Sequence, residues 1–206
     1  MAWQHAQVAD YPGRHDHADV FGVDHPLGGH DLQRRPGRPR EDVHEDVVFA
    51  QGLGEFTQVG LELGGVRHRY HSPLSRCIYL GTPPDELGRL SDVIAEGLEA
   101  VLAAVRPGAT CGELAEAWQR VITRHGVEKD SRIGYPVGLG YPPTWGELTA
   151  SLRIGDMTVL EAGMTFHCIP SIWRESYGMT ISETFAVTGT GAECFAQSPR
   201  RLLVKQ

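Results

Sequence analysis

The chain has 206 residues, of which 41% are hydrophobic and 22% are charged. This balance is typical of one globular domain and excludes a chain that is disordered throughout. The formal net charge of −7 disfavours a nucleic-acid partner, because such partners usually meet a basic surface. No run of about 18 apolar residues offers a membrane-spanning helix, so we expect no membrane partner either.

Four cysteines are spread along the chain, and no two of them form a C-x-x-C pair. They are Cys77, Cys111, Cys168 and Cys194. This spacing is not that of a zinc knuckle or of a dense disulfide framework. The first residues also lack the apolar stretch of a secretory leader. We therefore expect reduced thiols and a cytoplasmic protein.

Residues 1–60 differ from the rest of the chain, because their apolar residues follow no helical or strand period. We predict an irregular segment of low order there, followed by a domain over residues 61–206. A histidine- and aspartate-rich run from His15 to Asp31 leaves metal binding open as an alternative. A further alternative is that this segment is foreign to the domain, as a shifted reading frame in a GC-rich gene would make it.

Beyond residue 57 the hydrophobic pattern becomes regular. Residues 57–63 are predicted to be a strand, because their apolar residues alternate and two glycines follow, and residues 76–81 are predicted to be a second strand. Thr82 is predicted to cap a helix whose first residue is Pro83. Apolar residues then recur every three or four positions as far as Val105, which predicts one buried helical stripe.

A second helix is predicted to begin at Thr110, where Glu113 completes a capping box, and to end at Gly126. Strands are predicted over Gly163–Ile169 and Met179–Val187, the second from its alternating pattern. The order of two strands, two helices and several strands predicts an α+β fold. We expect an antiparallel sheet with helices on one face.

Four sequence blocks occur in the order known from one family: VRPGAT before a helix, a glycine-rich aromatic loop, VLEAGMTFHCIP and ISETFAVTGTGAE. The chain from about residue 62 to residue 205 therefore resembles the pita-bread superfamily of creatinase, methionine aminopeptidase and prolidase. The resemblance implies a curved antiparallel sheet. The superfamily's catalytic domain is longer than this stretch, so we expect an incomplete member.

The metallopeptidases of this superfamily bind two metal ions through Asp, Asp, His, Glu and Glu. By resemblance, the corresponding positions here are Glu62, Pro73, Tyr135, Ile169 and Glu183. Proline and isoleucine side chains have no lone pair for a cation, and two carboxylates do not complete a dinuclear site. We therefore expect no metal and no other cofactor. Creatinase, which hydrolyses a C–N bond without metal, is the precedent in the superfamily.

Three segments narrow the resemblance to the ectoine hydrolases: GGVRHRYHSPLSR, SRIGYPVGLGYPPTWGE and LEAGMTFHCIPSIW. This resemblance implies a small-molecule substrate that is a cyclic amidine, flat and cationic, with a ring carboxylate. Glu62 and Glu183 are the carboxylates expected to pair with its charge. Aromatic side chains are expected to cover its faces. These substrate-binding candidates are Tyr135, Tyr141, Trp145 and Trp173.

In the predicted reaction a carboxylate attacks the amidine carbon or activates a water molecule, and His71 or His167 protonates the leaving nitrogen. We predict that Glu62, Tyr135 and Glu183 converge on one concave surface, with one of these histidines within reach. Two other functions remain open: a prolidase-like Xaa-Pro dipeptidase, and a non-catalytic truncated remnant that either binds a partner or has no function. By resemblance, a complete chain is expected to form a homodimer.

Overall fold

The computed structural model describes residues 47–53, 57–141, 144–146, 148–174 and 177–206. The run from His15 to Asp31 and most of the predicted irregular segment lie outside the described residues. The first described residues form strand β1 (Val47–Leu53), which pairs with the next strand from Val47↔Gly64 to Leu53↔Gln58. The domain boundary predicted at residue 60 is therefore wrong, because the sheet begins before it.

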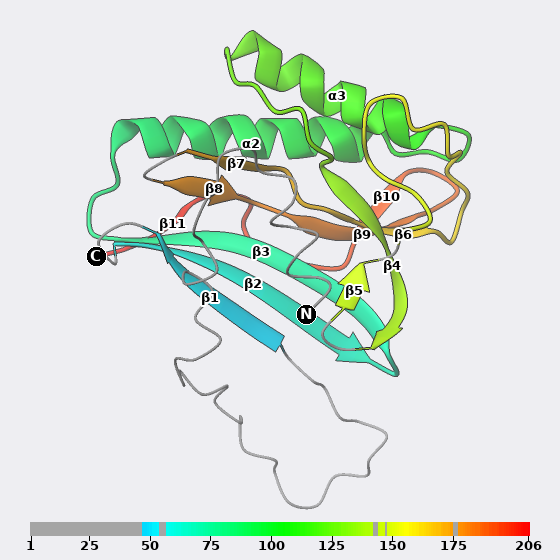
Figure 1. Ribbon diagram of the computed structural model, residues 1–206, viewed down its shortest axis with the longest axis horizontal. Coiled ribbons are helices and arrows are strands. Elements are labelled where there is room, and N and C mark those ends of the chain that lie inside the picture. Colours follow the sequence, from blue (N-terminus) through cyan, green and yellow to red (C-terminus); the bar gives the residue numbers. More distant parts are fainter. Residues whose placement is uncertain (1–46, 54–56, 142–143, 147, 175–176) are drawn as a thin grey trace, which may run out of the picture.

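One nine-stranded sheet dominates the fold, in the order β1-β2-β3-β4-β6-β9-β10, with β5 beside β4 and β11 beside β3. A second sheet consists of the hairpin β7–β8. The remaining strands are β2 (Gln58–Arg67), β3 (Tyr70–Leu80), β4 (Gly134–Tyr141), β5 (Thr144–Gly146), β6 (Thr165–Cys168), β7 (Ser171–Trp173), β8 (Gly178–Thr180), β9 (Glu183–Val187), β10 (Ala192–Cys194) and β11 (Leu203–Lys205). Figure 1 shows the sheet curling beneath two helices that cover one of its faces.

Strands β2 and β3 form a long hairpin, paired from Gln58↔Tyr79 to Arg67↔Tyr70. The turn consists of His68 and Arg69, which have φ values of 49° and 70°. A two-residue hairpin turn needs positive φ at both residues if its twist is to match that of the strands. The two strands predicted from the sequence are the outer parts of this hairpin. Its inner part is polar and contains a proline, so it lacks the apolar alternation from which strands are predicted.

The two helices are α2 (Asp85–Ala104) and α3 (Cys111–Arg124). The capping box of α3 is confirmed, because the Thr110 hydroxyl accepts from Glu113 N–H while the Glu113 carboxylate accepts from Thr110 N–H. The predicted start of α2 is wrong, because its N-cap is Pro84, without a side-chain cap. A proline disfavours helical geometry in the residue before it, so Pro84 keeps Pro83 out of the helix. No helix in the described part of the chain could cross a membrane.

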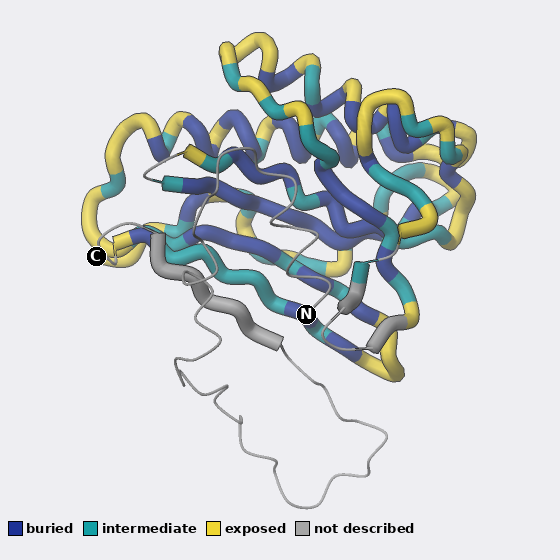
Figure 2. Tube along the Cα trace, viewed as in Figure 1, coloured by how far each residue is buried: buried dark blue, intermediate teal, exposed yellow. Residues whose placement is uncertain are grey.

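The helices pack closely because of one small residue. A Cβ atom on Gly97 would lie 2.3 Å from the ring of Trp118, so only glycine lets the indole of α3 approach α2. The predicted stripe of α2 is buried, and it includes Leu90, Ile94 and Leu98. Figure 2 shows the buried residues of both helices on the sides that meet each other and the sheet.

The single strand predicted over residues 179–187 is divided in two. Strand β8 ends at Thr180 and β9 begins at Glu183, so Ile181 and Ser182 pass the chain from the small sheet to the large one. The period of two nevertheless persists through this segment. Ile181 and Phe185 lie in the helix-side core, which leaves Ser182 and Thr184 on the other face.

Candidate active site

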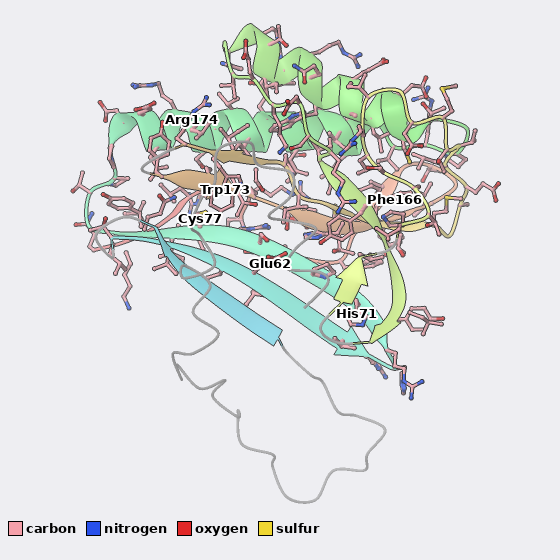
Figure 3. The ribbon with its side chains drawn as sticks, viewed as in Figure 1. Glu62, His71, Cys77, Phe166, Trp173 and Arg174 are labelled. Atoms are coloured by element: carbon pink, nitrogen blue, oxygen red, sulfur yellow. The ribbon has the colours of Figure 1, made fainter. Side chains whose placement is uncertain are left out.

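One face of the β2–β3 hairpin carries several candidate residues. In the register of the two strands, Glu62 lies opposite Ser75, Gly64 opposite Pro73 and Val66 opposite His71. Residues directly opposite in an antiparallel pair point to the same side of the sheet. Glu62, His71, Pro73 and Ser75 therefore share what we call the hairpin face, and Figure 3 shows Glu62 and His71 on these two strands.

Glu62 is the one carboxylic acid among the candidates on the hairpin face. Its Oε1 atom is buried and has no hydrogen bond within the described part of the chain. Burial raises the pKa of this carboxyl to about 7, because a charge loses the solvation of water without receiving a compensating partner. A cation placed beside Glu62 would supply that partner.

A second group of candidates comes from the neighbouring strands. Tyr135 of β4 lies opposite His167 of β6, which lies opposite Thr184 of β9. The Tyr135 hydroxyl is 3.0 Å from His167 Nδ1, and Ser182 Oγ is 2.7 Å from His167 Nε2. These contacts form the Tyr135–His167–Ser182 chain, a run of polar groups whose residues are all buried.

The hairpin face and this chain meet at two serines. Ser75 N–H donates to Ser182 Oγ at 2.6 Å, and Ser182 N–H donates to the Ser75 carbonyl at 3.1 Å. Since Ser75 is the cross-strand neighbour of Glu62, with Cβ atoms of such pairs about 5 Å apart, Glu62 lies one residue away from the chain. A continuous path of neighbouring residues, through Ser75 and Ser182, therefore links Glu62 to His167 and Tyr135.

His167 is completely buried, and its surroundings decide its charge. Burial lowers the pKa of its imidazole to about 3, because no carboxylate compensates the loss of water. His167 is therefore neutral near pH 7. A neutral ring carries one N–H donor and one acceptor nitrogen, so His167 acts here as a hydrogen-bonding group and does not store a positive charge.

Glu183 does not join this surface, and the predicted convergence is wrong for this residue. Its Oε1 atom lies 2.6 Å from Arg76 Nη2 and 3.2 Å from Arg200 Nε, and Arg200 also binds Glu99 of helix α2 at 2.5 Å. Glu183 therefore points to the helix side of the sheet, opposite to Ser182. Strand alternation was the available signal, because it groups Glu183 with the apolar Phe185.

Arg76 lies directly behind the site and fixes the backbone of both serines. Its Nη1 donates to the Ser75 carbonyl at 2.8 Å and to the Ser182 carbonyl at 2.5 Å. Its Nε and Nη2 donate to the carbonyls of Pro199 and Ser198 at 2.9 Å and 3.1 Å. The guanidinium thus ties β3, the start of β9 and the C-terminal segment together.

His71 and Trp173 lie towards opposite ends of the hairpin face. His71 is buried and lies four residues before Ser75 in β3, a separation of about 13 Å for an extended strand. Trp173 packs its ring against Gly178, whose carbonyl accepts from the side chain of Gln58, four residues before Glu62. Neither residue lies beside Glu62 in the register. The side chains of Tyr141 and Trp145 lie outside the described residues.

The positions that hold metals in the metallopeptidases do not fit a metal here. The Pro73 carbonyl is occupied by the Thr184 hydroxyl at 2.6 Å, and Ile169 packs against Tyr135 and Val137. The described residues contain no group of three or more His, Cys, Asp or Glu side chains that could hold an ion. The ligand set that a dinuclear centre requires is therefore replaced by apolar packing and one phenol.

A curled antiparallel sheet, two helices on its outer face and a polar site on its inner face define a pita-bread protein. The predicted fold is confirmed by a crystal structure of dipeptidase PepE from Mycobacterium ulcerans, which superposes with a TM-score of 0.70. Its sequence identity is 23%, over 78% of this chain and 48% of that one. Residues 40–189 match the model of metallopeptidase family M24, so the chain belongs to this family.

Two similar curated relatives are hydrolases by name. An uncharacterized hydrolase/peptidase, y4tM, of Sinorhizobium fredii is 47% identical over 145 residues, or 70% of this chain and 37% of the relative. The ectoine hydrolase of Halomonas elongata is 43% identical over 162 residues, or 78% of this chain and 40% of the relative. The chain thus spans about two fifths of the length of these relatives. The predicted resemblance to the superfamily and to ectoine hydrolase is confirmed.

Proposed function

We propose that this chain carries the C-terminal part of the site of a metal-independent C–N hydrolase that acts on ectoine or a similar cyclic amidine. The observation that carries the proposal is Glu62: a half-buried carboxyl group whose Oε1 atom is buried without a polar partner among the described residues, and whose pKa is raised to about 7. It stands on the hairpin face together with Pro73, which occupies one of the metal-ligand positions. A cationic ligand that brings its own charge fits this site better than metal ions fit it.

The resemblance to ectoine hydrolase of 43% identity supports this ligand class. Ectoine is a planar amidinium with a ring carboxylate, so its positive edge pairs with the Glu62 carboxylate. Tyr135 borders the same site from β4. Trp173, at the end of the hairpin face, is a candidate to cover the apolar part of the ring. Glu183 is withdrawn as a substrate-pairing carboxylate, because two arginines already neutralise it.

The proposed reaction adds one water molecule across an amidine C–N bond. Water oxygen bonds to the amidine carbon while Glu62 takes a water proton, as a general base. The tetrahedral adduct then breaks one C–N bond while its hydroxyl becomes the amide carbonyl, and the departing nitrogen takes up the proton held by Glu62 and the hydroxyl proton to leave as an ammonium group. The product is N-acetyl-2,4-diaminobutyrate, and no proton or electron is gained or lost overall. The charge needed at the reacting carbon comes from the protonated substrate.

The test combines binding and turnover. Calorimetric titration of ectoine into the chain should give the same affinity with EDTA as without it, and Glu62→Gln should weaken binding at least tenfold, because a charge-assisted hydrogen bond is worth about 1.5–3 kcal/mol. Glu161→Gln, which alters an exposed carboxylate, is the matched control. Turnover is followed by the appearance of N-acetyl-2,4-diaminobutyrate.

The same assay distinguishes the other two functions. Cleavage of an Xaa-Pro dipeptide that EDTA abolishes and manganese restores would overturn the proposal in favour of a metallodipeptidase. A chain that neither binds ectoine nor hydrolyses it would overturn it in favour of an incomplete domain without its own activity. The second outcome bears on the length of the chain, because the relatives are about two and a half times as long as the matched region.

A further inference from the structure

We infer that Ser182 is a positioning residue that holds His167 in the Nδ1–H tautomer and thereby makes the Tyr135 hydroxyl a hydrogen-bond donor towards the bound substrate. This inference deepens the proposed function and rests on it for the identity of the substrate. Neither Ser182 nor this role was predicted from the sequence, which directed attention to Glu183.

The hydroxyl group of Ser182 is hydrogen-bonded on two sides. Ser75 N–H donates to its oxygen at 2.6 Å, so the hydroxyl hydrogen must point elsewhere. Within the described part of the chain, the other hydrogen-bond partner of Ser182 Oγ is His167 Nε2, at 2.7 Å. Both side chains are completely buried. The hydroxyl hydrogen therefore goes to His167 Nε2, which acts as an acceptor.

The tautomer of His167 follows from the direction of the Ser182 hydroxyl. A neutral imidazole with an acceptor at Nε2 carries its hydrogen on Nδ1, and that hydrogen is donated to the Tyr135 oxygen at 3.0 Å. The opposite tautomer would leave the Ser182 hydroxyl hydrogen buried without an acceptor, at a cost of about 1–3 kcal/mol. The low pKa of His167 agrees with a neutral ring.

The contact with His167 also sets the direction of the Tyr135 hydroxyl. Because its oxygen accepts from His167, its own hydrogen is directed away from His167. The two rings meet edge to face, with centroids 5.4 Å apart and an interplanar angle of 85°, which fixes the phenol. A donor held in advance at such a site stabilises an oxygen that becomes more negative, as the hydroxyl oxygen of the tetrahedral adduct does when it loses its proton and becomes the amide carbonyl.

Arg76 supports the Tyr135–His167–Ser182 chain from behind. Arg76 binds the carbonyls of Ser75 and Ser182 at 2.8 Å and 2.5 Å, and Glu183 neutralises it from the helix side. The two serines are therefore held in one register by a guanidinium that does not face the site. Such support from behind is what keeps a catalytic donor in place.

The test reads the tautomer directly by two-dimensional NMR of the chain labelled with 15N-histidine. Long-range couplings should show a protonated Nδ1 and an unprotonated Nε2 for His167 at pH 7, assigned by loss of the signals in His167→Gln. Ser182→Ala should reverse the tautomer, because Tyr135 then donates to Nδ1. Ser171→Ala, which alters another buried serine outside the site, should leave it unchanged. Tyr135→Phe keeps Ser182 and should keep Nδ1–H.

Turnover of ectoine supplies the second readout. Ser182→Ala should lower kcat at least tenfold with less than a twofold change in KM, since the donor acts on charge that develops during the reaction. An Nε2–H tautomer in the unaltered chain, or an Nδ1–H tautomer that persists in Ser182→Ala, would overturn the inference. Absence of ectoine binding together with the expected tautomer would overturn the proposed function and leave the tautomer assignment standing.

Discussion

Ser182 and Glu183 are adjacent in the chain, and their side chains serve opposite faces of the sheet. Ser182 meets His167 on the inner face at 2.7 Å, whereas Glu183 meets Arg76 on the helix side at 2.6 Å. One residue of register thus separates a candidate substrate site from a buried ion pair. The pair is connected to the site through Arg76, which also binds the Ser182 carbonyl.

Glu183→Ala should therefore reduce stability while leaving ligand binding nearly unchanged. Removal of one partner leaves the buried Arg76 guanidinium with too little negative charge, and breaking such a pair typically costs about 3–5 kcal/mol. Urea unfolding at pH 7 should show this loss. Glu99→Ala removes only the exposed end of the same network and should lower the free energy of unfolding by less than about 1 kcal/mol. A Glu183→Ala chain that is as stable as the unaltered one would contradict the assignment.

The helix caps give a prediction that compares two threonines. Thr110→Ala should destabilise the chain by about 1 kcal/mol, because the capping box at the start of α3 loses its hydroxyl acceptor. Thr82→Ala should change the free energy of unfolding by less than about 0.5 kcal/mol, because α2 begins after Pro84 without a side-chain cap. Thermal unfolding of both variants measures the difference. Equal destabilisation would mean that Thr82 caps α2 after all.

Local patterns in the sequence predict the helices and the fold well. The stripe of α2 and the capping box of α3 are short-range signals, and the structure contains both. The start of α2 was misplaced by two residues, because the signal of Thr82 followed by proline is opposed by the second proline. Strand β1 was not predicted at all, although it forms a hairpin with the next strand, because residues 1–60 show no sustained hydrophobic period.

The candidate site could be predicted only in part, for a reason that concerns register. The resemblance predicts Glu62 and Tyr135 on one inner surface with His71 or His167 within reach, and this shared site stays a prediction. It placed Glu183 there too, because a carboxylate is the expected residue type in that strand. Alternation with Phe185 opposes that placement, but the buried partner Arg76 is 107 residues away in the chain. No local pattern shows that Arg76 neutralises this charge.

The raised pKa of Glu62 predicts a specific pH dependence of stability. The folded chain retains the Glu62 proton up to about pH 7, whereas the unfolded chain loses it near pH 4.5, so the folded state loses stability as the pH rises between these values. Glu62→Gln removes this loss. The variant should match the unaltered chain below pH 4.5 and become more stable by up to about 3 kcal/mol above pH 7.

Urea unfolding of both chains from pH 4 to pH 8 measures this difference. The comparison at each pH cancels the contribution of His167, whose lowered pKa acts in the opposite direction: its neutral buried ring favours the folded state less as the pH falls below 6.5. A constant difference between the two chains across this range would show that the Glu62 carboxyl titrates normally.

Binding of the proposed substrate should depend on the same proton. Ectoine carries a positive charge that pairs only with the ionised Glu62 carboxylate, and this group is mostly protonated below pH 7. The dissociation constant should therefore rise about tenfold for each pH unit below 7, and binding at pH 6 should release close to one proton. Calorimetry in two buffers of different ionisation enthalpy counts that proton. The Glu161→Gln control should release the same number of protons as the unaltered chain, whereas Glu62→Gln should release none. An affinity that is constant from pH 5.5 to pH 7.5 would exclude Glu62 as the partner of the cation.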